Sequence, residues 1–418
     1  MNFLIKQAKI IDKESKNHLK KMDIFIENGI IKSIGKSLSP TKTHKIIDLE
    51  NLHVSTGWFD SSVCFGEPGY EERETLSNGL NVAAKSGFTA VAINPLTNPI
   101  TDNKAGISFI KEKANNNLVN VYPIGALTQK SEGVELAEMY DMQQAGAIAF
   151  TDYGKGIANS NLLKLALQYT QNFDAIVMSF PLDINIASEG QMHEAKQSTL
   201  NGLKGIPAMA EIIQIKRDLT LLTYTGGRLH IPTISCKRSV QLIKNAKKKG
   251  LKVTCSVAAH HLVLTDTEIS DFDTSYKVSP PLREPSDIKA LINGVLDGTI
   301  DMITSDHNPI DIENKKIEFA HALNGSIGLE SLFGAVNNCI DLEILIEALT
   351  NKPRKCFNLE TTSVNENQLA NLTFFNPKGD YIFEGKHILS TSKNAIFLNK
   401  NLKGNVYGVI NNGKMILN

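Results

Sequence analysis

The sequence has too few cysteines, in the wrong arrangement, for a disulfide-stabilised fold. Its 418 residues contain five, an odd number, and no two of them form a CxxC pair. This usage is typical of proteins that stay in a reducing compartment. The first residues also lack the apolar core and the small-residue cleavage site of a signal peptide, and no apolar run approaches the length of a membrane span. We therefore expect a cytoplasmic protein with no membrane partner.

An excess of charge of either sign is missing as well. Lysine plus arginine and aspartate plus glutamate each number 44, so the formal net charge is zero. No dense basic run offers phosphate groups a surface from which counterions would be released. The composition thus predicts no nucleic-acid partner.

Short apolar runs bounded by turn residues occur at both ends of the chain, in residues 1–55 and 366–418. Asn-Gly turns at residues 28–29 and 412–413 separate strand-like runs, which is the pattern of β-hairpins. We interpret the two ends as the two parts of one small β domain.

The middle of the chain, residues 56–365, alternates apolar strand-like runs with segments of helical periodicity. The strand-like runs are residues 57–64, 88–95, 119–127, 147–152, 175–181, 228–235, 251–259 and 300–306. Helical patterns at residues 74–85, 161–170, 239–249 and 286–297 lie between them, and Gly87 and Gly250 stop two of these helices. Eight strand-helix units predict a closed (β/α)8 barrel of the TIM type, in which chemistry takes place where the strands end.

Several motifs in one order resemble a known family. The run GWFDSSVCFGEPG at residues 57–69 resembles the dihydroorotase signature GLIDxHxHFREPG. It is followed by GFTAV at 87–91, AFTD at 149–152, GIP at 205–207, HHL at 260–262, KVSPPLR at 277–283 and TIDMITSDH at 299–307. Over nearly its whole length the chain is similar to long-form bacterial dihydroorotases of the amidohydrolase superfamily. Asp152 favours that family over the related hydantoinases and allantoinases, which carry a carboxylated lysine at this point.

The resemblance implies a centre of two zinc ions that convert a bridging water into hydroxide, which attacks a ring amide. The histidines that bind these ions in the family correspond here to Ser62, Cys64, Ser179 and Thr233. Two matching carboxylates remain, Asp152 at the position of the bridging ligand and Asp306 at that of the terminal ligand and general base. Two carboxylates alone are a poor set of zinc ligands, so we expect no cofactor.

The positions that correspond to substrate-binding residues have changed too. The family's arginine is replaced by Gly66, so that no guanidinium is left to pair with the orotate carboxylate. Asparagine, asparagine and histidine are replaced by Leu96, Ser279 and Ile310. No two of the ten histidines are separated by a single residue, so the chain contains no HxH motif, and it has no HExxH motif either.

Three of the remaining residues allow more than one interpretation. Asp306 with His307 could be a remnant general base beside a substrate-binding residue, or two hydrogen-bonded polar residues at a strand end. Asp152 could bind a cation or satisfy a neighbouring loop. Cys64 could complete a mononuclear zinc site with Asp152 and Asp306, but sulfur at a buried strand end more often packs as a small apolar group.

These observations leave three hypotheses for function. The first is a noncatalytic dihydroorotase-like subunit, a pseudoenzyme that forms a homodimer or another homo-oligomer and supports the assembly of aspartate carbamoyltransferase, as such members of the resembled family do. The second is an active dihydroorotase or related cyclic amidohydrolase with a rebuilt or mononuclear zinc site. The third is a small-molecule binding module that uses the old pocket without turnover.

Overall fold

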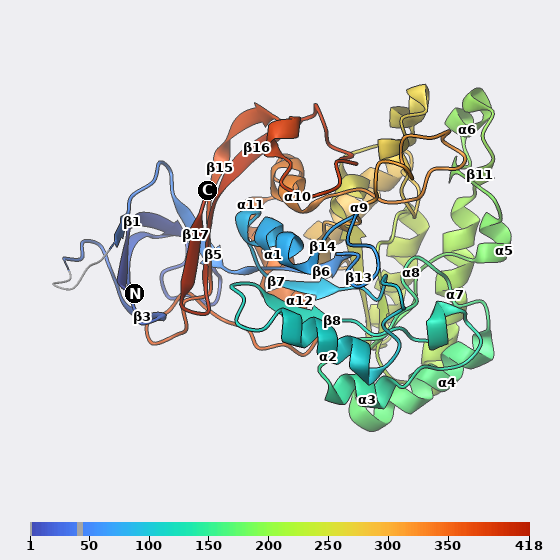
Figure 1. Cartoon of the computed structure of the whole chain (residues 1–418), viewed down its shortest axis with the longest axis horizontal. Helices are drawn as coiled ribbons and strands as arrows, with labels where there is room; N and C mark the ends of the chain where they lie inside the picture. The colour runs from blue at the N-terminus through green and yellow to red at the C-terminus, as the bar shows by residue number, and fades with distance from the viewer. Residues whose placement is uncertain (1, 40–44) are drawn as a thin grey trace.

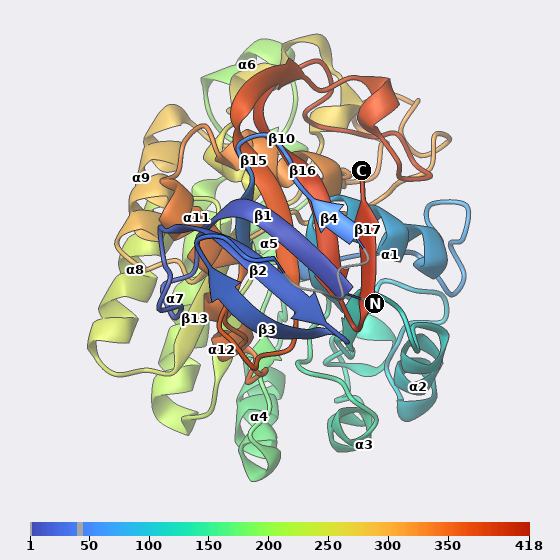
Figure 2. The same cartoon turned by 90° about the vertical axis from the view of Figure 1, so that its left-hand side faces the viewer.

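The structure, a computed structural model, describes residues 2–39 and 45–418 and has two parts, a β domain and a barrel (Figure 1). Both described ends of the chain lie on the β domain (Figures 1 and 2). Its sheet runs in the order β17-β16-β15-β5-β1-β2-β3, and β4 pairs with β1. The bounds are β1 Asn2–Ile10, β2 Lys21–Glu27, β3 Ile30–Gly35, β4 Lys45–Ile47, β5 His53–Thr56, β15 Leu372–Ile382, β16 Asn401–Asn411 and β17 Lys414–Leu417.

Alternating apolar residues explain why the two ends of the chain form one sheet. Ile5 and Ile24 from the first segment pack with Leu372 and Phe374 from the last segment in one buried cluster. Strand β5 lies at the junction, because it pairs parallel to β1 and antiparallel to β15. A side chain on one face of a strand recurs every second residue, so each strand can place its apolar face on this shared core. The predicted β domain built from both termini is confirmed.

The barrel strands are parallel and follow one another in the predicted order. They are β6 Trp58–Val63, β7 Phe88–Ile93, β8 Asn120–Pro123, β9 Val177–Met178, β12 Leu229–Ile231, β13 Val253–Ala258 and β14 Met302–Thr304. The predicted run at residues 147–152 is not a regular strand, but Phe150 bridges in parallel to Gly125 on one side and to Val177 on the other. A parallel bridge between Val63 and His307 joins the last strand to the first and closes the barrel.

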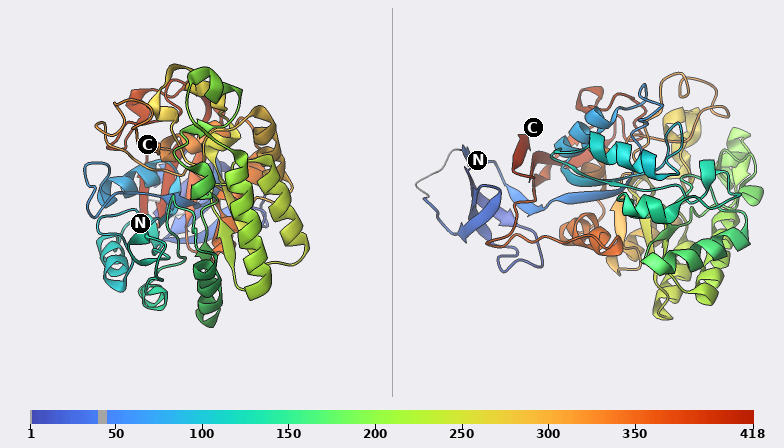
Figure 3. Two further views of the ribbon diagram at one scale, coloured as in Figure 1. Left: turned by 90° about the vertical axis from the view of Figure 1, so that its right-hand side faces the viewer. Right: turned by 60° about the horizontal axis from the view of Figure 1, so that its bottom comes forward.

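Helices surround the barrel, as Figure 3 shows. Their bounds are α1 Leu76–Lys85, α2 Lys104–Lys113, α3 Met139–Gln144, α4 Ser160–Thr170, α5 Ile184–Ala187, α6 Lys196–Asn201, α7 Ala208–Thr225, α8 Lys237–Lys248, α9 Pro285–Leu296, α10 Leu329–Val336, α11 Leu342–Leu349 and α12 Asn351–Cys356. Side chains of Thr75, Asn103 and Asn159 accept backbone N–H groups at the starts of α1, α2 and α4. Gly87 and Gly250, the predicted stops, both have positive φ. The short pair β10 Met192–His193 and β11 Gly205–Ile206 lies outside the barrel sheets.

One aromatic cluster joins the two parts. The ring of Trp58, at the start of β6, lies 4.9 Å from that of Phe333 on α10 and 5.5 Å from that of Phe375 on β15. The Trp58 indole N–H donates to Ser55 Oγ at 3.0 Å, so its polar atom is satisfied inside the core. The barrel and the β domain thus share a packed interface.

None of the helices within residues 2–39 and 45–418 combines the length and the apolarity that crossing a lipid bilayer would need.

Candidate functional site

Strand ends bring five polar side chains together at the mouth of the barrel, and we call this group the Asp306 network. Ser62 on β6 donates its hydroxyl to Asp306 Oδ1 at 3.0 Å, and the Tyr153 hydroxyl donates to the same oxygen at 3.1 Å. Asn94, just after β7, donates to Ser62 Oγ at 2.9 Å and lies 3.8 Å from Cys64 Sγ. The members of the network are Ser62, Cys64, Asn94, Tyr153 and Asp306. The network is therefore a chain of hydrogen bonds that ends on one carboxylate oxygen.

Burial sets the protonation of this network. It raises the pKa of Asp306 to about 6, while the hydrogen bonds from Ser62 and Tyr153 act in the opposite direction. Burial, helped by the charge of Asp306, also raises the pKa of the Cys64 thiol far above its usual value. The thiolate, not the thiol, is the nucleophile and the metal ligand, so Cys64 is poorly suited to either role.

These residues do not fit the zinc centre that the resemblance implies. A zinc site needs several imidazole, thiolate or carboxylate donors with free lone pairs. In the Asp306 network, Ser62, Asn94 and Tyr153 are neutral, Cys64 is protonated, and Asp306 Oδ1 already accepts two hydroxyl groups. The donor set therefore offers one carboxylate where the family uses a group of histidines and carboxylates.

Asp152, the second carboxylate of the resemblance, is bound to a loop rather than to this network. Its Oδ1 accepts the N–H groups of Leu127 and Thr128 at 3.1 and 3.0 Å, and its Oδ2 accepts the Thr128 hydroxyl at 2.5 Å. All three bonds fix the segment that follows β8. Among the described residues, Cys64, Asp152 and Asp306 are not a group whose ligand atoms all lie within 4.8 Å of one another, so the structure does not assemble the mononuclear site.

Ser179 and Thr233, at the other two positions that the resemblance assigns to zinc-binding histidines, also form hydrogen bonds outside the Asp306 network. Ser179, after β9, donates to Asp218 Oδ2 on α7 at 2.6 Å. Thr233, after β12, has φ +47° and donates its backbone N–H to Ser256 Oγ at 3.1 Å. Asp306 itself has φ +49°. Such conformations are uncommon for residues other than glycine, so the backbone has an unusual geometry both at Thr233, an altered position, and at Asp306, a retained carboxylate.

At Gly66, the position of the family's arginine, the backbone excludes any side chain. Its φ is +60°, and a Cβ atom added there would lie 2.5 Å from the carbonyl oxygen of Tyr70. Of the remaining changed positions, Leu96 is half-buried and Ser279 precedes Pro280. Ile310 is buried, and its backbone N–H donates to Asn394 Oδ1 at 3.2 Å. Position 66 therefore cannot supply the guanidinium that the resemblance implies for the substrate carboxylate.

The ring of His307 is not part of the Asp306 network, although its backbone carbonyl accepts the Cys64 N–H at 2.7 Å. Its Nδ1 accepts the backbone N–H groups of Gly328 and Leu329 at 3.2 and 3.4 Å, and its ring contacts that of Phe65 edge to face. Burial lowers the pKa of His307 to about 3, so the ring is neutral. These contacts give His307 a place between the barrel and the start of α10, where it does not support the predicted substrate-binding role.

Asn94 and Tyr153 are functional-site residues that the sequence did not reveal. Tyr153 follows Asp152 directly, and Asn94 follows β7 directly. Inspection of the residue immediately after the run at 147–152 would have drawn attention to Tyr153, whereas Asn94 lies inside the predicted run at 88–95 and gave no such signal.

Comparison with known proteins identifies the family. A family model described as "Dihydro-orotase-like" matches residues 53–239. A protein of Geotalea daltonii named dihydroorotase is 38% identical over 422 residues, with 100% of this chain and 99% of the relative covered. The chain belongs to the dihydroorotase family. A second member, from Acetivibrio thermocellus, is also 38% identical and covers 99% of this chain and 98% of its own length.

Solved structures show that this dihydroorotase-family chain has the amidohydrolase fold. The L-hydantoinase (dihydropyrimidinase) from Arthrobacter aurescens matches with a TM-score of 0.85 and 21% identity over 99% of this chain and 96% of its own. The D-hydantoinase (dihydropyrimidinase) from Thermus sp. matches with a TM-score of 0.81 and 21% identity over 99% and 95%. The predicted (β/α)8 barrel with an added β domain is confirmed.

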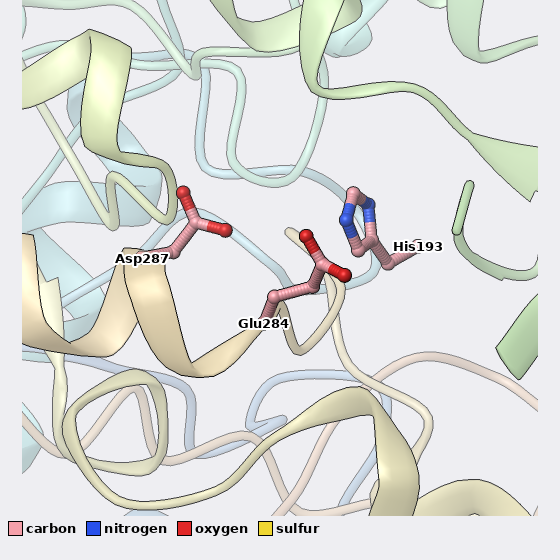
Figure 4. Close-up of side chains that lie close together, drawn as sticks. All are labelled: His193, Glu284 and Asp287. Atoms are coloured by element: carbon pink, nitrogen blue, oxygen red, sulfur yellow. The ribbon is translucent and has the colours of Figure 1, made fainter. Parts of the chain in front are cut away.

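One other group in the described part of this dihydroorotase-family chain could hold a metal ion. His193 on β10, with Glu284 and Asp287 at the start of α9, places its ligand atoms within 4.8 Å of one another (Figure 4). However, Arg283 Nη1 donates to His193 Nδ1 at 2.8 Å, so the proton of the neutral ring is on Nε2. Burial, with the nearby Arg283 charge, lowers the pKa of His193 to about 4. The ring has no free lone pair in this arrangement, and the group does not fit a zinc ion.

A cavity of about 900 Å3 lies beside Ile310, at the same end of the barrel. It is bounded by residues 310–316 after β14 and residues 391–394 before β16, and by Glu72, Thr274 and Ser275. This space lies next to Ile310, one of the positions that the resemblance assigns to substrate binding, so it is a candidate pocket for a small molecule.

The Tyr153 hydroxyl is expected to stabilise the charged form of Asp306. Tyr153→Phe should lower the free energy of unfolding by about 1–3 kcal/mol at pH 8, because a buried carboxylate loses a donor. The cost should shrink at pH 5, below the pKa of about 6, where Asp306 is protonated in the folded state. Urea unfolding at both pH values measures this difference.

The sign of this pH dependence follows from the raised pKa. Folded protein binds the Asp306 proton more tightly than unfolded protein, so this group lowers stability as pH rises from 3.8 to about 6. Tyr140→Phe is the matched control, since Tyr140 is 47% exposed and should change stability by less than about 0.5 kcal/mol. An equal loss from Tyr153→Phe at both pH values would contradict the assignment.

Proposed function

We propose that this chain is a noncatalytic member of the dihydroorotase family, which serves pyrimidine biosynthesis as a structural subunit. One observation carries the proposal: Ser62 and Tyr153 both donate to Asp306 Oδ1, at 3.0 and 3.1 Å. Hydrolysis of a ring amide in this family depends on a metal-activated hydroxide. The Asp306 network provides hydroxyl donors where that chemistry needs metal ligands, so the hydroxide would not form.

The missing substrate contacts support the same proposal. Gly66 has no side chain to pair with a carboxylate, and the Tyr70 carbonyl leaves no space for one. Ile310 presents an apolar side chain at the position of a histidine. A site without metal ligands and without groups that contact the substrate would neither bind dihydroorotate nor hydrolyse its ring amide.

Zinc content tests the proposal directly. We expect well under one zinc ion per chain after dialysis against a mild chelator, because the four histidine positions are now two serines, one threonine and one cysteine. Elemental analysis gives the stoichiometry. The Geotalea daltonii dihydroorotase, prepared in the same way, is the control. Two tightly held zinc ions in this chain would contradict the proposal.

A second candidate function is an active dihydroorotase, and the comparisons favour it. Relatives that bear this name are 38% identical over the full length of the chain. Activity would require a rebuilt zinc site around Asp306 and Cys64. One firmly bound zinc ion per chain, lost in Cys64→Ser, would support this function over the first.

The surface of helix α7 supports a role in assembly. Met209, Ile213 and Tyr224 are 57%, 38% and 78% exposed, and their spacing along α7 places them on one side of the helix. Helix α7 itself lies on the outside of the barrel (Figures 1 and 3). Met209 and Ile213, one helical turn apart, give this side of α7 an exposed apolar end suited to a protein contact, and the exposed Lys216 and Thr220 lie between them and Tyr224. The partners we propose are a second copy of this chain and aspartate carbamoyltransferase.

Co-elution at micromolar concentration tests the proposed assembly. We expect this chain and aspartate carbamoyltransferase to elute together. The double substitution Met209→Lys and Ile213→Lys should abolish co-elution, because both lysine charges would lie in the contact. Ile382→Lys, on the β domain and also exposed, is the matched control. If deletion of this chain leaves the size and activity of the carbamoyltransferase unchanged and no protein co-purifies, the assembly role is wrong.

A further inference from the structure

Two Asn-Gly turns in the β domain have nearly the same backbone but different side-chain contacts. Asn28 and Gly29 join β2 to β3, and Asn412 and Gly413 join β16 to β17. The two φ angles are +51° and +78° in the first turn and +51° and +70° in the second. A Cβ atom added to Gly29 would lie 3.6 Å from Gly413 Cα, so the turns also lie beside one another. Differences in reactivity between the two asparagines must therefore come from their side-chain contacts.

The Asn412 side chain is held by the segment at the start of β8. Its Nδ2 donates to Asn120 Oδ1 at 2.9 Å and to the carbonyl oxygens of Asn117 and Leu118 at 3.0 and 3.5 Å. These bonds fix the carboxamide and bind the nitrogen that deamidation would release as ammonia. The side-chain carbon can turn onto the next peptide nitrogen only after they break.

Asn28 has no such contacts. It is exposed, and among the described residues its side chain has no hydrogen-bond partner. The Gly29 N–H has no acceptor among them either, although the Gly29 carbonyl accepts the Ala370 N–H at 2.8 Å. Glycine has no side chain to shield its peptide nitrogen. Asparagine is a thermolabile residue, and here both reacting groups are accessible.

The four other Asn-Gly sequences of the chain are protected in different ways. Two lie inside α1 and α9, whose helical hydrogen bonds fix the backbone. In a third, at the end of α6, Asn201 Nδ2 donates to the Ile269 carbonyl at 2.8 Å. In the fourth, the Gly325 N–H donates to the Lys277 carbonyl at 3.0 Å. In the part of the chain that the structure describes, residues 28–29 therefore form the least protected Asn-Gly sequence.

We propose that Asn28 is a site of spontaneous deamidation, with water as the co-reactant. The Gly29 nitrogen bonds to Asn28 Cγ, the bond from Cγ to Nδ2 breaks, and the Gly29 amide proton leaves with Nδ2 as ammonia. Water then opens the five-membered imide at one of its two carbonyl carbons, which gives aspartate or isoaspartate. Atoms and electrons balance without an oxidant or reductant. The site goes beyond the proposed structural role and does not depend on it.

Isoaspartate at residue 28 would disturb the contact between the two ends of the chain. Its backbone continues through the side chain and is one carbon longer, so the pairing of Glu27 with Ile30 across the turn would lose its register. Beside this pair, Ile31 exchanges backbone hydrogen bonds with residues 367 and 368, and Gly29 accepts the Ala370 N–H. The modification should therefore loosen the segment 367–370 from β3.

Peptide mapping by mass spectrometry tests this site. The full-length protein is kept folded at mildly alkaline pH, where hydroxide removes the Gly29 proton faster, and replacement of NH2 by OH is followed at all six Asn-Gly sequences. We expect Asn28 to be modified at least about fivefold faster than Asn412, because hydrogen bonds must break first at Asn412. In concentrated urea, where both side chains are free, the two rates should converge. Asn28→Gln would need a larger ring, so it should stop modification at residue 28.

Asn120→Ala gives a second readout, at the protected turn. It removes the acceptor nearest to Asn412 Nδ2, so modification should become faster at Asn412 and stay unchanged at Asn28. Asn115→Ala is the matched control, since this nearby asparagine is exposed and should affect neither turn. Equal or faster modification at Asn412 in the folded wild-type protein, or an unmodified Asn28 there while the urea sample reacts, would overturn the proposal.

Discussion

Dihydroorotate hydrolysis by the purified protein is expected to be undetectable, against the turnover of roughly one per second or more that is ordinary for enzymes. The reaction needs a metal-bound hydroxide and a positive group for the substrate carboxylate. Asp306 Oδ1 instead accepts Ser62 and Tyr153, and Gly66 offers no side chain. A coupled assay at saturating dihydroorotate, with added zinc, measures the rate.

Restoring part of the metal site should not restore the reaction. Ser62→His with Cys64→His adds two imidazoles, but Ser179 remains bound to Asp218 and Tyr153 still contacts Asp306. The Geotalea daltonii dihydroorotase, assayed in parallel, is the positive control. Wild-type turnover near one per second would show that the chain is an active enzyme and that the proposed function is wrong.

The second large effect is expected at a buried ion pair near the barrel mouth. Arg283 Nη2 lies 3.6 Å from Glu211 Oε2, and both side chains are almost fully buried. Arg283 also donates to Ser235 Oγ at 3.0 Å and to the Ile206 carbonyl at 3.1 Å. Glu211 accepts the N–H groups of Ser235 and Cys236 and the hydroxyl of Ser239. The pair therefore ties β11, α7 and the segment after β12 together.

Arg283→Met should lower the free energy of unfolding by about 3–5 kcal/mol, because it leaves the buried Glu211 carboxylate without its counterion. The midpoint of urea unfolding measures the loss. Glu211→Gln combined with Arg283→Met should recover part of it, which a double-mutant cycle quantifies. Lys244→Met is the control, since its pair with Asp297 is solvent-exposed and is worth about 1 kcal/mol or less. A loss below about 1 kcal/mol for Arg283→Met would show that the pair is not structural.

Helices and family motifs were predictable from the sequence because their signals are local. The pattern predicted a helix over residues 239–249, and α8 spans Lys237–Lys248. Apolar periodicity and capping residues act within a few positions of one another, so they can be read along the chain. The run at residues 147–152 was harder to assign, because whether the segment around Phe150 forms a strand depends on the segments that pair with it on both sides.

The partners of the candidate site could not be predicted in the same way. Ser62 and Asp306 are 244 residues apart, and Asn94 and Ser62 are 32 apart. Matching positions to a family indicated which ligands had been lost. It did not indicate that Tyr153 would contact Asp306, or that Asp152 would bind the loop at Thr128.

Residue identity and local order were enough to predict the fold class, the dihydroorotase family and the absence of an HxH zinc-binding motif. Only the tertiary structure decided which polar groups meet. It gave the side chains of Asp306 and His307 different partners and bound Asp152 to the loop at Thr128. The physical reason is that hydrogen-bond partners and burial depend on how distant strands and loops pack, and both set the protonation state of a side chain.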